Sequence, residues 1–187
     1  MFICHSEMST GFKKLLGKII KEEKMKFIQP TIEYKKTFEN FINVFESVSS
    51  IDGSWFWWEF VNAATTIQLL QDYAVWKNLP DWYVPASTYW LIKDETMIGT
   101  LNLRHELSKF LLQQWWHIGY AIYPDYRKKW YWKEILRLGL IEAQKIWIKK
   151  VLLTCNEDNT WSEKVIRANG WKYEDTRNGK KRFWIMS

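Results

Sequence analysis

The sequence predicts a mixed α/β fold in a single domain. Segments with apolar residues at helical spacing alternate with short apolar runs that are typical of strands. Tight turns at Asp94-Glu95 and Asn178-Gly179 each join two strand-like runs, which indicates antiparallel pairs. The 187 residues, 47% of them apolar, are enough for one hydrophobic core and too few for two domains.

The first half of the domain starts at Met25 and contains two expected helices. A short strand covers residues 26–29, and a helix near 33–48 carries its apolar side chains on one face. A second helix is expected near 60–75. The runs "STYWLIKD" and "TMIGTLNLR", residues 87–104, are expected to form two strands around a tight turn.

The second half continues the alternation of strands and helices. The expected strand in "HIGYAIYP" has to stop at Pro124, because proline has no N–H to donate to a strand ladder. The expected elements are a strand in "HIGYAIYP", a helix from Lys133 to about Ile146, a buried-type strand in "KKVLLTC", a helix from Asn159 or Thr160, and strands near 171–176 and 181–186.

Residues 1–24 differ in character from the rest of the chain. The stretch "GFKKLLGKIIKEEK" has the pattern of a basic amphipathic helix, which could lie on a membrane surface. A packing helix, or a stretch that is not part of the native protein, is the alternative. The stretch "MKFIQPTIEYKK" from Met25 has the pattern of a natural domain start. We therefore favour a non-native or accessory extension at 1–24 and a domain at 25–187. Interspersed lysines exclude a secretory signal.

Composition narrows the class of protein. The net charge of +6 favours an anionic ligand, but it is too modest and too scattered to indicate nucleic acid. No apolar stretch approaches the length of a membrane span. Two cysteines provide no disulfide framework, and no metal-ligand spacing joins them to the histidines at 5, 105 and 117. We therefore expect a cytoplasmic protein without a metal site.

The stretch "RKKWYWKEILR" combines a basic turn with a helix start. Arg127, Lys128 and Lys129 lead into a helix N-terminus, where free backbone N–H groups can bind an anion. Such a turn normally uses glycine, so that backbone can approach the anion, yet Trp130 and Trp132 stand there. Taken alone, the basic run is most simply a solvated helix start.

The surrounding motifs resemble the GNAT superfamily of N-acetyltransferases over residues 25–187. The resemblance is carried by "GTLNLRH", "HIGYAIYPDYRKKWYWKEIL" and "NEDNTWSEKVIRANGW" in this order. It implies a central mixed, mostly antiparallel sheet with splayed middle strands, flanked by helices. It also implies acetyl-CoA as cosubstrate, whose pyrophosphate lies on an R-x-x-G-x-G turn. The residues implied for binding are Tyr120, Ala121 and Ile122 along the pantetheine, Arg127, Lys128, Lys129, Trp130, Tyr131 and Trp132 at the pyrophosphate, and Asn159 near the thiol.

The resemblance implies direct attack of an amine on the thioester, which needs a base and an acid. His117 stands near the place where relatives carry a glutamate base, and His105 and Glu106, just after the third expected strand, are the other candidates. Relatives often carry a tyrosine acid in the helix after Asn159, but that region reads Val165-Ile166, so Ser162 is the candidate here. For each histidine a structural hydrogen bond is the competing interpretation. We expect a small-molecule or peptide amine as acceptor, with no nucleic acid or membrane partner, and leave a homodimer open.

Tryptophan usage is unusual, with 14 tryptophans and only 8 glycines. Trp90 and Trp184 stand in strands, where aromatic residues are expected. We hypothesise that the others are UGA codons that the organism reads as glycine. They occupy places typical of glycine in turns and helix ends, namely positions 55, 57, 58, 76, 82, 115, 116, 130, 132, 147, 161 and 171.

Two other interpretations take the tryptophans at face value. A GNAT-like domain with a blocked cofactor turn would be a non-catalytic binding module. A basic protein with exposed aromatic rings could instead stack on single-stranded nucleic acid or on sugars. The tryptophans follow the glycine positions of one enzyme family rather than one surface stripe, which favours the acetyltransferase.

Overall fold

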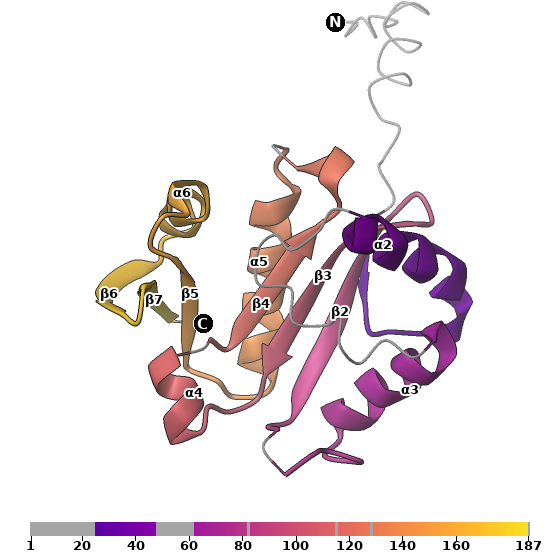
Figure 1. Cartoon of the computed structure of the whole chain (residues 1–187), viewed down its shortest axis with the longest axis horizontal. Helices are drawn as coiled ribbons and strands as arrows, with labels where there is room; N and C mark the ends of the chain where they lie inside the picture. Colours follow the sequence, from indigo (N-terminus) through magenta and orange to yellow (C-terminus); the bar gives the residue numbers. More distant parts are fainter. Residues whose placement is uncertain (1–24, 48–61, 82, 115, 128, 187) are drawn as a thin grey trace, which may run out of the picture.

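The computed structural model describes residues 25–47, 62–81, 83–114, 116–127 and 129–186 (Figure 1). The expected extension at 1–24 lies outside these residues, as does Lys128. In chain order the elements are β1 (Met25–Ile28), η1 (Ile32–Tyr34), α2 (Lys35–Ser47), α3 (Ala63–Ala74), β2 (Ala86–Lys93), β3 (Thr96–Arg104), α4 (Lys109–Gln114), β4 (Ile118–Ile122), η3 (Pro124–Tyr126), α5 (Tyr131–Lys145), β5 (Lys150–Asn156), α6 (Thr160–Ala168), β6 (Lys172–Arg177) and β7 (Lys180–Met186).

The strands form two antiparallel sheets, in the orders β1-β2-β3-β4 and β5-β7-β6. Helices α2 and α3 cover one face of the first sheet, and α5 covers the other (Figure 1). This arrangement confirms the predicted mixed fold with a mostly antiparallel sheet flanked by helices.

Strand β2 separates two apolar cores because its side chains alternate between the faces of the sheet. Tyr89 and Leu91 belong to the core on the α5 side. Trp90 and Ile92 belong to the core under α2 and α3, where the ring centroids of Trp90 and Phe38 lie 4.7 Å apart. This strand is buried on both faces and therefore serves both layers of the fold.

Two local features differ from the sequence prediction. Helix α5 begins at Tyr131 rather than Lys133, so Trp132 lies inside its first turn. Helix α4, which was not predicted, has only six residues and is too short to show a helical period. Its first turn is capped by Ser108, whose Oγ accepts a hydrogen bond of 3.2 Å from the Leu111 N–H.

Helices α3, α5 and α6 end in the same way. The residue after the cap is left-handed in each, at Trp76 (φ 63°), Trp147 (φ 63°) and Gly170 (φ 85°). The next amide then donates back to the carbonyl five residues earlier, at Asp72 (2.9 Å), Ala143 (3.0 Å) and Ile166 (3.4 Å) respectively. This is the Schellman motif, whose left-handed position is usually glycine because a side chain there is strained.

Candidate functional site

Hydrogen bonds between His117 and Leu152 join the two sheets. The backbone N–H of His117, just before β4, donates to the carbonyl of Leu152 on β5 at 2.8 Å. The Leu152 N–H donates in return to Nδ1 of the His117 side chain at 2.9 Å. Beyond this junction β4 and β5 diverge toward the start of α5 (Figure 1). We call the pair of diverging strand edges the slot.

One edge of β4 faces the slot. The Tyr123 N–H donates to the Ile98 carbonyl at 2.9 Å, so this residue pairs toward β3. Alternate residues of a strand direct their amide groups to opposite edges, so Ala121 also faces β3, whereas Tyr120 and Ile122 face the slot. Because β4 is the last strand of its sheet, an extended chain could pair along this outer edge, as an added strand would.

His117 holds the closed end of the slot. Its side chain is buried, and burial followed by the charge of Arg104 lowers its pKa from 6.5 to about 4. The imidazole is therefore neutral at pH 7 and, since Nδ1 accepts a hydrogen bond, it carries its proton on Nε2. A ring in this tautomer positions the two strands and has no vacant nitrogen for a second proton.

His105 directly follows β3, whose last residue, Arg104, donates its backbone N–H to the carbonyl of His117 at 2.8 Å. The Nε2 of His105 lies 2.8 Å from Oγ of Ser87, and burial lowers its pKa below 6.5. Its backbone N–H donates to the carbonyl of Pro85, which fixes the segment just before β2. The imidazole is therefore a free base at neutral pH, the protonation state that a general base requires.

The basic turn lies at the open end of the slot, before α5. The Nε of Arg127 donates to the Ile122 carbonyl at 3.1 Å, which folds this side chain back over β4. Lys129 is exposed, with Nζ 5.1 Å from the ring centroid of Tyr126. No side chain caps the N-terminus of α5 at Trp130, so its first amides and these cations form a positive region.

Asn159 begins α6 as predicted. Its Oδ1 accepts a hydrogen bond of 2.9 Å from the Ser162 N–H and so caps the helix. Ser162 lies half-buried in the first turn of α6. Both residues are therefore held at a helix N-terminus, which favours a neighbouring negative charge such as a thiolate.

Aromatic rings extend from α5 toward α6. Trp132 on α5 and Trp161 on α6 contact each other edge to face, with ring centroids 6.1 Å apart. Trp130 is 50% exposed, and its ring lies 4.9 Å from that of Tyr131. The backbone and charges of this turn fit a diphosphate, and these indole rings lie at the same turn.

The structure therefore brings together the predicted β4 residues, the turn at α5 and Asn159 and Ser162 on α6 around one slot. The part played by Leu152 was not predicted. It lies 35 residues from His117, and no local pattern indicates which apolar residue of a buried strand pairs across a junction.

Within the described ranges, no helix is both long and apolar enough to cross a bilayer. The same residues contain no cluster of three or more His, Cys, Asp or Glu side chains that could hold a metal ion.

Comparisons with known proteins agree on one family. A family model described as the acetyltransferase (GNAT) domain matches residues 37–172. No curated protein sequence matches the chain. Similar solved structures include the Salmonella typhimurium acetyltransferase that modifies the N-terminal serine of ribosomal protein L7/L12, at 14% identity over 87% of this chain and 95% of that chain, with a TM-score of 0.59.

Two further solved structures share the fold. The microcin C7 self-immunity acetyltransferase MccE, in complex with acetyl-CoA and AMP, is 16% identical over 89% of this chain and 94% of that chain, with a TM-score of 0.60. A spermidine N-acetyltransferase chimera from Vibrio cholerae is 13% identical over 87% of this chain and 95% of that chain, with a TM-score of 0.57. Because the family match spans most of the domain, the chain belongs to the GNAT acetyltransferases, the acetyl-CoA-dependent N-acetyltransferases that its motifs resemble.

Proposed function

We propose that the protein transfers the acetyl group of acetyl-CoA directly to a primary amine of its acceptor. The observation that carries this proposal is the slot, in which the outer edge of β4, the last strand of its sheet, leads from a helix N-terminus to the junction of His117 and Leu152. In the reaction the amine nitrogen bonds to the acetyl carbon, the carbon–sulfur bond breaks, and the amine proton passes to a base. The departing thiolate takes up a proton or is stabilised as an anion.

The binding residues follow from the geometry of the slot. Tyr120 and Ile122 lie along the outer edge of β4, where an extended pantetheine arm would run, and the Ile122 carbonyl also accepts a hydrogen bond from Arg127. The first amides of α5, with Arg127 and Lys129, supply donors and positive charge for the diphosphate. Asn159 at the start of α6 lies on the other side of the slot.

For the proton transfers, we assign His105 as the base and Ser162 as the candidate acid. His105 is favoured over His117 because the Nδ1 of His117 already accepts a hydrogen bond from Leu152. His105→Gln is expected to lower kcat and to leave the affinity for acetyl-CoA unchanged, whereas His117→Gln is expected to weaken acetyl-CoA binding through the slot. Equal effects of both variants on kcat and affinity would contradict this division of roles.

We also propose that glycine stands at the tryptophan positions of the turns in the protein's own cell. Trp76 and Trp147 occupy the left-handed position that Gly170 fills at the third helix end, and they are 62% and 85% exposed. A left-handed residue other than glycine costs about 1–2 kcal/mol. Exposed indoles also gain little from burial that could offset this strain.

Two tryptophans at the starts of helices α5 and α6 support the same proposal. Trp132 extends from α5 toward Trp161, and glycine at these two positions would open the approach to the slot. A gene in which UGA encodes glycine explains all of these positions at once.

Binding of CoA to matched full-length chains tests both proposals. The first chain has the printed sequence, and the second carries Trp130→Gly, Trp132→Gly and Trp161→Gly. A control carries Trp76→Gly and Trp147→Gly, which changes two helix ends away from the slot. By isothermal titration calorimetry, the second chain is expected to bind at least about tenfold more tightly than the first, a difference of about 1.4 kcal/mol.

The control is expected to bind CoA like the printed sequence. Release of free thiol from acetyl-CoA in the presence of amines then measures transfer by the second chain. Saturable CoA binding with no transfer would support a binding module instead. Binding of a single-stranded oligonucleotide or a sugar by the printed sequence, with no CoA binding by any chain, would support the aromatic-stacking alternative.

The acceptor, the location and the assembly belong to the proposal as well. The acetyltransferases similar in structure are named for a protein N-terminus and for spermidine, so both classes of amine are suitable first acceptors. A cytoplasmic location fits a reaction that draws on acetyl-CoA. A homodimer is testable by sedimentation of the full chain.

A further inference from the structure

Arg182 on β7 has the most deeply buried charged side chain among the described residues, with 2% of its surface exposed. Its Nε donates to Oε2 of Glu174 at 3.0 Å and forms an ion pair with Oδ1 of Asp175 at 3.1 Å. A guanidinium that leaves water needs charged partners and hydrogen bonds to compensate for the lost hydration. Both carboxylates come from the neighbouring strand β6.

A β-bulge presents these two carboxylates to one arginine. Strand β6 pairs with β7 through Tyr173 and Phe183, and then through Thr176 and Lys181. Two residues of β6 therefore oppose the single residue Arg182 of β7, which is the pattern of a bulge. The hairpin is built to hold this guanidinium in one place.

The other end of the guanidinium holds helix α4. Nη1 of Arg182 donates to the carbonyl of Leu112 at 2.7 Å and to that of Gln113 at 3.4 Å. These carbonyls lie in the last turn of α4, where helix carbonyls have no partner within the helix. A single side chain therefore joins β6 and β7 to a helix about 70 residues earlier in the chain.

The same face of β7 contacts the chain that follows α4. Alternate residues of a strand share one face, so Lys180 and Trp184 lie on the face of Arg182. Nζ of Lys180 lies 5.9 Å from the ring centroid of Trp116, and the rings of Trp184 and His117 meet edge to face at 6.2 Å. We call residues 112–114, 116 and 117 the docked segment.

The docked segment ends at the junction of the two sheets. His117 exchanges hydrogen bonds with Leu152, and Leu152 is the register partner of Trp184. Arg182 holds backbone carbonyls, so its contacts persist if glycine stands at position 116. A shift of the docked segment would move His117 against Leu152 and change the slot.

We propose that Arg182 is a positioning residue for acetyl transfer, which holds the docked segment so that His117 stays joined to Leu152 and the slot keeps its shape. Arg182 acts through the docked segment and not by contact with the cofactor. The β6–β7 hairpin thereby contributes to acetyl-CoA affinity. This proposal rests on the proposed acetyl transfer.

Hydrogen exchange with mass spectrometry tests the link in the full chain that carries Trp130→Gly, Trp132→Gly and Trp161→Gly. Arg182→Lys keeps the charge but lacks the planar fork that spans β6 and α4. Amides of the docked segment are expected to exchange at least about tenfold faster in this variant, because local opening no longer breaks charge-assisted hydrogen bonds. Amides of β2, which is far from α4 in the sheet order, are expected to be unchanged.

Arg177→Lys is the matched control. Arg177 is exposed on β6, and its Nε donates to Asp175 at 2.7 Å, but it has no hydrogen bond to α4 among the described residues. Its exchange pattern is expected to match that of the parent chain. Glu174→Gln weakens the anchor of Arg182 and keeps its fork on α4, so it should show a smaller effect of the same kind. It also provides a test if Arg182→Lys does not fold.

Calorimetry and kinetics then separate positioning from simple stabilisation. Arg182→Lys is expected to weaken CoA binding at least about fivefold, the lower end of typical coupling between sites. KM for acetyl-CoA should rise in parallel, while kcat changes less than about twofold because the reacting groups remain. A purely structural role would reduce the melting temperature and the amount of folded protein, but the folded molecules would keep their affinity.

The outcomes distinguish failure of this proposal from failure of the proposed function. Unchanged exchange of the docked segment in Arg182→Lys would overturn the link. Faster exchange with unchanged CoA affinity would also overturn the proposal, since the docked segment would then not govern the slot. Absence of CoA binding by the parent chain would instead overturn the proposed function, and the exchange result would still decide whether Arg182 holds the docked segment.

Discussion

Glycine at position 147 is expected to be more stabilising than alanine, the reverse of their order inside a helix. Trp147 has φ 63° and is 85% exposed at the end of α5. Trp147→Gly and Trp147→Ala both remove the indole, so their difference isolates the effect of Cβ. Relief of left-handed strain stabilises the glycine variant relative to the alanine variant by about 1–2 kcal/mol. The greater conformational freedom of glycine in the unfolded chain destabilises it by about 0.5–1 kcal/mol. The glycine variant is therefore expected to be more stable by roughly 0.5–1 kcal/mol.

Urea denaturation of the two full-length variants measures this difference, and thermal unfolding should show a gap of about 1–4 °C. Gln144, an exposed residue inside α5, provides the matched control. There the glycine variant is expected to be less stable than the alanine variant by about 1 kcal/mol. At Gly170, where an added Cβ would meet nothing within 4 Å, Gly170→Ala should lose stability through strain alone. Equal stability of Trp147→Gly and Trp147→Ala would refute the argument from backbone strain.

Three further outcomes are expected. The buried His117 has a pKa of about 4, against 6.5 in the unfolded chain, so its contribution to stability is complete above pH 6.5 and falls by at most about 3 kcal/mol as the pH drops toward 4. The variant His117→Asn keeps a hydrogen-bond acceptor and should flatten this part of the pH profile of urea midpoints. An unchanged profile would contradict the assignment. Burial raises the pKa of the Cys155 thiol to about 11, so mass spectrometry should find its peptide unmodified by iodoacetamide at pH 8 unless the protein is first unfolded. Asn159→Ala should lower the free energy of unfolding by about 1 kcal/mol because it removes a helix cap, whereas Asn159→Asp keeps the cap. Loss of acetyl-CoA affinity in both variants would indicate that the amide group itself contributes to binding.

Most of the fold could be predicted because local signals and tertiary contacts agree. The turn at Asp94-Glu95 is left-handed at both residues, with φ 47° and 65°, as a two-residue hairpin between β2 and β3 requires. The turn at Asn178-Gly179 is left-handed at both residues as well, with φ 50° and 73°. In β2, alternate side chains enter two different cores, which matches its continuous apolar sequence.

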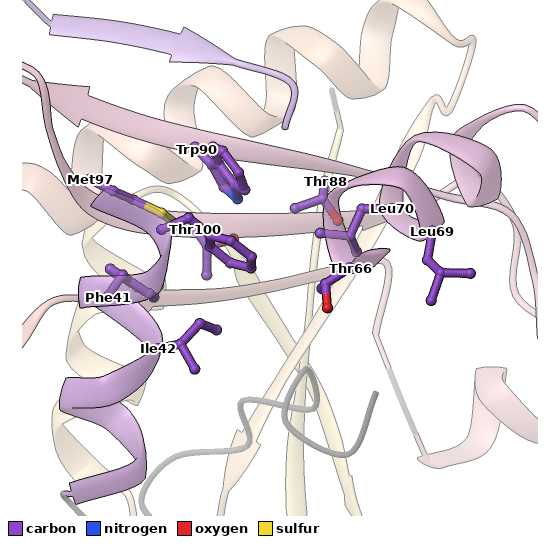
Figure 2. Close-up of a pocket in the computed structure, with 10 residues that line it drawn as sticks. Phe41, Ile42, Thr66, Leu69, Leu70, Thr88, Trp90, Met97 and Thr100 are labelled. Carbon is purple, nitrogen blue, oxygen red and sulfur yellow. The ribbon is translucent and has the colours of Figure 1, made fainter. Parts of the chain in front are cut away.

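The candidate site was less predictable, because it depends on contacts between distant segments. The basic turn and the helix cap at Asn159 are local and were found from sequence. The hydrogen bonds between His117 and Leu152 are not local, so the structural part played by this imidazole became visible only in the fold. A cavity between α2, α3, β2 and β3 combines residues from four elements (Figure 2), and no single stretch of sequence indicates it.

The residues that the cell places at 130 and 132 decide the central claim, since the acetyl-CoA site requires an open turn there. Peptide mass spectrometry of the protein purified from its own cells measures them directly. The account predicts glycine at positions 130 and 132 in the peptide that follows Arg127, and tryptophan at 90 and 184. Tryptophan at both 130 and 132 would contradict it, because the natural protein would then carry indole rings at the approach to its own cofactor turn.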